Sequence, residues 1–95
     1  MDTTALADIV RAIIEHQESI MGPLAVERAN NVDGVSADDS GIRIDSHVTD
    51  TKKILAQLVG SYQELFGQTS VEVCKDAVRT IHVHISDKDL PDILK

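Results

Sequence analysis

Hydrophobic residues recur at intervals of three and four along two long stretches of the chain, which is the spacing of an amphipathic helix. The first stretch runs from Thr3 to Met21 and the second from Asp50 to Gly67. Thr49 or Asp50 can cap the second helix, and Gly67 is expected to end it. The apolar stripes are Leu6, Ile9, Val10, Ile13, Ile14, Ile20 and Met21 in the first helix, and Ile54, Leu55, Leu58, Val59, Tyr62, Leu65 and Phe66 in the second.

Gly22 and Pro23 interrupt the N-terminal helical pattern. Glycine favours a helix end, and the fixed φ of proline suits the first position of a new helix. The stretch "PLAVERAN" that begins at Pro23 is therefore predicted to be helical as well. The pattern does not decide between two helices and one kinked helix.

Strict alternation replaces the helical spacing between residues 35 and 44. Val35 and Ala37 alternate with polar residues, as do Ile42 and Ile44, and the acidic turn 38–41 separates the two pairs. This pattern predicts a β-hairpin. Two strands alone are marginally stable in water, so the hairpin must pack on the helices or be extended by another chain.

The segment from residue 69 to residue 85 fits a helix better than a strand. Thr69 and Glu72 have the spacing of a capping box. An apolar stripe follows at helical spacing, made of Val71, Cys74, Val78, Ile81 and Ile85. A strand would place His82 and His84 on one face, whereas on a helix they lie about 200° apart around the axis.

One flank of this helix is unusually apolar. It carries Val73 and Ala77, beside Thr80 and His84. An all-round apolar helix is usually buried, so either the helix is central in the fold or this flank contacts another chain.

These patterns together predict an α+β, mainly helical fold in a single domain, 1–95. We expect an N-terminal helix broken at Gly22-Pro23, one β-hairpin, and two longer helices packed as an antiparallel pair. A short C-terminal helix is predicted in "DKDLPDILK".

Charge and composition exclude several classes of partner. The net charge of −7 disfavours nucleic acid and anionic membranes, and Tyr62 and Phe66 are the only aromatic residues available for stacking on bases. No apolar run approaches the roughly 20 residues of a membrane span. The N-terminal stretch lacks the basic start of a signal peptide, and Cys74 is the single cysteine, so we expect a cytoplasmic protein.

The search for chemistry yields one constellation. Cys74, His82 and His84 are suitable zinc ligands, but their spacing matches no compact zinc motif. The acidic turn does not fit a calcium-binding loop, and the isolated glycines form no phosphate-binding loop. We therefore expect no metal, no cofactor and no catalytic residue.

The function that we predict from the sequence is a small interaction or regulatory module without catalytic activity, acting as a homodimer. Its predicted surface combines the flank of the fourth segment with the hairpin: Val73, Ala77, Thr80, His84, Ile42 and Ile44. The alternative is a metal- or small-ligand-binding protein that uses His82, His84 and Cys74. That alternative requires a strand at residues 79–85.

Overall fold

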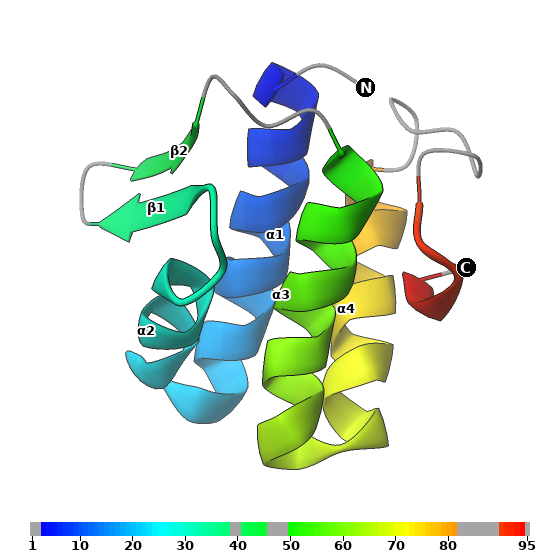
Figure 1. Ribbon diagram of the computed structural model, residues 1–95. Helices are drawn as coiled ribbons and strands as arrows, with labels where there is room; N and C mark the ends of the chain where they lie inside the picture. The colour runs from blue at the N-terminus through cyan, green and yellow to red at the C-terminus, as the bar shows by residue number, and fades with distance from the viewer. Residues whose placement is uncertain (1–2, 39–40, 46–49, 82–89, 95) are drawn as a thin grey trace.

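The computed structural model describes residues 3–38, 41–45, 50–81 and 90–94. The predicted α+β, mainly helical class is confirmed (Figure 1). The elements in chain order are α1 (Thr3–Met21), α2 (Leu24–Asn30), β1 (Val35–Asp38), β2 (Gly41–Ile44), α3 (Thr51–Phe66), α4 (Gln68–Ile81) and the short 3₁₀ helix η3 (Asp92–Leu94).

The N-terminal helix ends where Gly22 adopts a left-handed backbone with φ of 62°. That conformation suits glycine, and the chain resumes as α2 after Pro23. Most of the predicted stripe of α1 is buried, but the last turn is not, and Ile20 is 41% exposed. The side chain of Gln17 lies in the core instead.

The third helix follows its prediction closely. The side chain of Asp50 caps it by accepting a hydrogen bond from the Lys53 N–H at 3.1 Å, and Gly67 with φ of 62° ends it. Its buried residues are Ile54, Leu55, Leu58, Val59 and Tyr62. Phe66, in the last turn, is 43% exposed.

Only Gly67 separates α3 from α4. Thr69 lies inside the first turn of α4 and not at its N-cap, and Glu72 accepts a hydrogen bond from Gln68 instead of closing a capping box. The helix returns along α3 and packs against both α1 and α3 (Figure 1). Residues 79–81 are helical, while His82 and His84 lie outside the described residues.

The hairpin forms as predicted. β1 and β2 are antiparallel, and Val35 and Ala37 face the core. β1 contacts α2 and β2 contacts α1, so the helices support the inner face of the hairpin. Near the C-terminus, Leu90 and Leu94 are buried where η3 contacts α3 and α4.

Candidate interaction surfaces

The outer edge of β1 is closed by a side chain. The Asn30 amide donates to the Ala37 carbonyl at 2.9 Å and accepts from the Ala37 N–H at 2.6 Å. The Val35 N–H bonds to the Val32 carbonyl at 3.1 Å. Asn30 thus satisfies the main chain of Ala37 as a neighbouring strand would, and a further strand cannot pair there.

The outer edge of β2 is different. The register pairs Ala37 with Ile42 and Val35 with Ile44. The main-chain groups of Ala37 bond to Asn30 and therefore point away from β2. Both pairs are thus non-hydrogen-bonded pairs of the antiparallel ladder. In such pairs the N–H and C=O groups of Ile42 and Ile44 point away from β1, toward the outer edge. Across the described parts of the chain, no hydrogen bond reaches these groups. Among the described residues, the hairpin therefore has one edge closed by Asn30 and one edge, that of β2, without a partner; this second edge is called the open edge below.

The outer face of the hairpin is charged and exposed. Arg43 donates to Asp38 on the other strand at 2.9 Å, and both side chains are largely in solvent. Asp45 continues the ladder beyond β2, since its N–H bonds to the Gly34 carbonyl at 2.9 Å. Arg43 and Asp45 therefore lie on the same exposed face, next to the open edge.

The predicted flank of α4 does not form one surface. Ala77 is fully buried and belongs to the core, Val73 is half-buried, and Thr80 is exposed. The Thr80 hydroxyl donates back to the Ala77 carbonyl at 2.7 Å. His84 lies outside the described residues.

The two parts of the predicted surface are also separated in space. Figure 1 shows the hairpin and α4 on opposite sides of α1, which contacts both. Sequence spacing identified each part, but it could not place one relative to the other. Ile42 and Ile44 therefore belong to a different side of the molecule from Val73 and Thr80.

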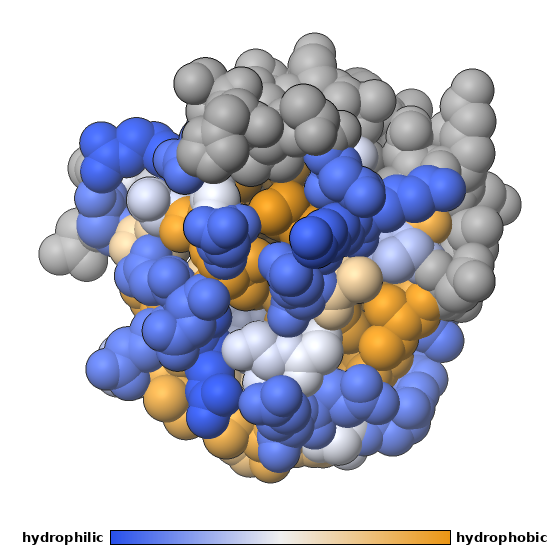
Figure 2. Space-filling view, in the orientation of Figure 1, coloured by the Kyte–Doolittle hydropathy of each residue, from blue (hydrophilic) through white to orange (hydrophobic). Residues whose placement is uncertain are grey.

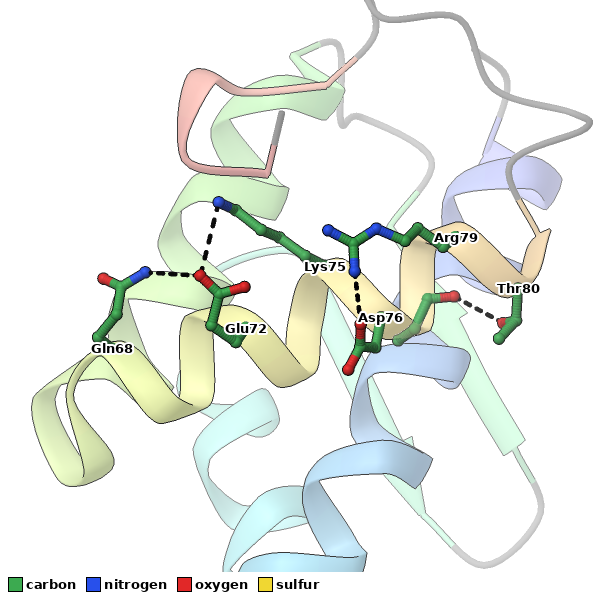
Figure 3. A network of polar contacts seen from close by, with 7 residues as sticks. Gln68, Glu72, Lys75, Asp76, Arg79 and Thr80 are labelled. Atoms are coloured by element: carbon green, nitrogen blue, oxygen red, sulfur yellow. Dashed lines mark hydrogen bonds and ion pairs between the residues drawn. The ribbon is translucent and has the colours of Figure 1, made fainter.

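Figure 3 shows that the outward face of α4 is occupied by polar contacts within the helix. Glu72 bonds to Gln68 at 3.1 Å and lies 3.9 Å from the Lys75 ammonium. Arg79 bonds to Asp76 at 2.6 Å. Such pairs are typical of a solvated helix face.

A buried polar cluster joins α1 to α4 at Cys74. The Gln17 amide donates to the Ser70 carbonyl at 3.0 Å and to the Cys74 sulfur at 3.2 Å. Burial raises the pKa of the Cys74 thiol to about 11, although the hydrogen bond from Gln17 acts in the opposite direction. The thiol is therefore protonated near neutral pH and unreactive. Sequence reasoning missed Gln17, because glutamine is a residue type that is mostly exposed in folded proteins.

Of the three residues of the metal-binding alternative, Cys74, His82 and His84, only Cys74 lies within the described residues. In these parts of the chain there is no group of three or more His, Cys, Asp or Glu side chains that could hold a metal ion. Cys74 lies in the core beneath Gln17, while His82 and His84 fall outside the described residues.

A groove of about 710 Å³ lies between α2 and α3. Gly60 is on its α3 side, and a Cβ added there would meet no atom within 4 Å. Arg28 lies 3.6 Å from Glu64 in the same groove. The lining is mixed in charge and largely polar, so it does not indicate one class of ligand.

Two large hydrophobic side chains, Ile20 and Phe66, are exposed where α1 and α3 end. Figure 2 shows hydrophobic surface at this lower end of the molecule. Isolated exposed side chains of this kind are common on monomeric proteins, so they do not by themselves indicate a partner.

Comparison with protein-family models, with characterised proteins and with solved structures finds no significant match to this chain. Within the described residues, no helix has the length and apolar content needed to cross a membrane. The function must therefore be argued from the surfaces themselves.

Proposed function

We propose that this chain is a small cytoplasmic protein-interaction module without catalytic activity, and that it acts as a homodimer. In this proposal two copies join through the open edge of β2. The observation that carries it is the contrast between the two edges of the hairpin: Asn30 closes one, and the other presents Ile42 and Ile44.

An open strand edge is a template for another strand, and natural proteins normally cover it. A two-stranded hairpin also gains stability when more strands are added. A second copy of the same chain offers a strand of matching length and the same unpaired groups. Two copies related by a twofold axis would form a four-stranded antiparallel sheet.

The charges favour one register for this pairing. In a symmetric antiparallel pair, Ile44 can lie opposite Ile44, Ile42 opposite Ile44, or Ile42 opposite Ile42. The first choice places Arg43 opposite Asp45 of the second copy, twice. The second places Arg43 opposite Arg43, and the third places it opposite Gly41. Since opposite charges across strands stabilise and like charges destabilise, the charges favour the first register, in which the described parts of the two strands overlap over residues 43–45.

The test is sedimentation equilibrium over a wide concentration range, with matched charge variants. Arg43→Asp and Asp45→Arg each replace two opposite-charge pairs by two like-charge pairs, so each should raise the dimer Kd about tenfold or more. The double variant Arg43→Asp/Asp45→Arg restores opposite charges and should recover most of the affinity. Both substitutions are at exposed positions, so circular dichroism should show an unchanged fold in all three variants.

Two results would overturn the pairing through β2. One is a chain that stays monomeric at all concentrations. The other is a dimer that none of the three variants affects but that Val73→Asp dissociates, because this would place the interface on α4. Equilibrium runs with chelator and with added zinc complete the test. Assembly that requires zinc would favour the metal-binding alternative with His82 and His84.

A further inference from the structure

A second groove lies between α1, α2 and the turn end of the hairpin, with a volume of about 270 Å³. The apolar residues that line it are Ile14, Val26, Ala37 and Ile42, and they form the side of the groove called its floor below. Ile14 and Ala37 are almost fully buried, while Val26 and Ile42 are half-buried and pack against the core. The groove is large enough for one long side chain, and its floor suits an aliphatic one.

The rim of this groove is acidic. Glu15, Glu18 and Asp38 line it, together with Arg11. Arg11 is bound to Asp8 at 2.7 Å, so its charge is already matched.

Glu15 and Glu18 differ from the other rim residues. Both side chains are exposed, and among the described residues neither has an ion pair. An apolar floor beside unmatched carboxylates is complementary to a side chain with an aliphatic stem and a cationic head.

We infer that this groove binds the side chain of a lysine or arginine from a basic segment of a partner protein. The stem of that side chain lies on Val26 and Ile42, and its head contacts the carboxylates of Glu15 and Glu18. The net charge of −7 assists by steering basic partners toward the chain.

This inference does not depend on pairing through β2. The groove uses the inner side of the hairpin and the side chain of Ile42, whereas strand pairing uses the outward main-chain groups of Ile42 and Ile44. A homodimer would therefore carry two such grooves. Failure of either proposal leaves the other testable.

The probe is a short capped peptide, Gly-Leu-Lys-Leu-Gly, titrated into the ¹⁵N-labelled full chain and followed by NMR. Saturable shifts are expected at the amides of Glu15, Glu18 and Ile42, and an arginine peptide should behave alike. A norleucine peptide keeps the stem without the charge, and a diaminopropionic acid peptide keeps the charge on a short stem. Each should bind about tenfold more weakly.

Variants of the chain separate the groove from general attraction to an acidic protein. Glu18→Gln and Glu15→Gln should each weaken the lysine peptide about five- to tenfold without changing the dimer Kd. As a control, Asp76→Asn removes one negative charge from the exposed face of α4 and should leave the affinity for the lysine peptide nearly unchanged.

Three results would overturn the inference. Equal weakening by Asp76→Asn would show attraction by net charge alone. Equal binding of the diaminopropionic acid peptide would show that the apolar floor is not used. Equal or tighter binding of spermidine with the same shifts would identify a free polyamine, and not a protein segment, as the occupant.

Discussion

Gln17 and Ser70 lie 53 residues apart in the chain, yet the Gln17 amide bonds to the Ser70 carbonyl at 3.0 Å in the core. The Ser70 hydroxyl also approaches the Gln17 carbonyl oxygen at 3.5 Å. The pair joins the last turns of α1 to the first turn of α4. It fixes the position of α1 relative to α4 along the helix axes. An amide must meet its hydrogen-bond partners at defined positions, whereas aliphatic side chains can pack in several positions.

Gln17→Ala is expected to lower the free energy of unfolding by about 2–3 kcal/mol, since it leaves a cavity and removes hydrogen bonds from buried partners. Ser70→Ala removes only the long hydroxyl contact and should lower it by less than about 1.5 kcal/mol. Urea unfolding of both variants and of the double variant measures the coupling between them. If the Gln17→Ala variant had the same free energy of unfolding as the unaltered chain, the role assigned to this pair would be contradicted.

Stability is expected to fall as the pH rises above about 9. Burial raises the pKa of the Cys74 thiol from 9.0 to about 11, and burial also raises the pKa of Tyr62, whose hydroxyl donates to the Ala25 carbonyl at 2.7 Å. The unfolded chain therefore loses these protons at a lower pH than the folded chain does. Between pH 9 and 11, Cys74 alone should contribute a slope of about −1.4 kcal/mol per pH unit.

Urea titrations at several alkaline pH values measure this slope, and Cys74→Ala provides the comparison. The variant differs in packing, so only its slope is compared. The slope should be shallower than that of the unaltered chain. An identical slope would show that the thiol ionises alike in the folded and the unfolded chain.

Asn30→Ala should lower stability by about 1–2 kcal/mol, because the Ala37 N–H and C=O lose their partners at a partly buried edge. The neighbouring Asn31→Ala is the control, since that side chain is exposed and has no hydrogen bond among the described residues. Hydrogen exchange should accelerate at the Ala37 amide in the first variant and not in the second. Equal effects of both variants would count against a closed β1 edge.

Gly60→Ala should stabilise the chain by about 0.5–1 kcal/mol, because glycine in a helix interior is unfavourable and the added methyl group meets no atom within 4 Å. Gly67→Ala should act in the opposite direction, because its φ of 62° is strained for alanine. Thermal unfolding of the two variants compares them directly. A loss of stability in Gly60→Ala would mean that the groove between α2 and α3 is narrower than the structure shows.

Periodicity predicted most of the fold. It identified the buried face of α3, the hairpin and the end of the first helix, because these depend on neighbours close in sequence. It misplaced the ends of the stripes: Ile20 and Phe66 continue the spacing, but no element of the core covers the ends of α1 and α3. The apolar flank of α4 is compatible with a central helix or with a partner surface, and the burial of Ala77 agrees with the first, because α4 packs against two helices.

The surfaces were harder to predict for a related reason. The hairpin was expected to need support, and Ile42 and Ile44 do lie at its open edge. The closure of β1 depends on one contact from Asn30, seven residues before Ala37, and no pattern signals it. The groove beside Glu18 combines residues from α1, α2 and both strands, so it exists only after the chain has folded.

The contact between Asn30 and Ala37 also limits stoichiometry. If two copies pair through β2 as proposed, Asn30 blocks the outer β1 edge at both sides of the sheet. Such a sheet would end at four strands and would not propagate into a fibre. One asparagine would thus allow the chain to expose a strand edge while keeping its assembly finite.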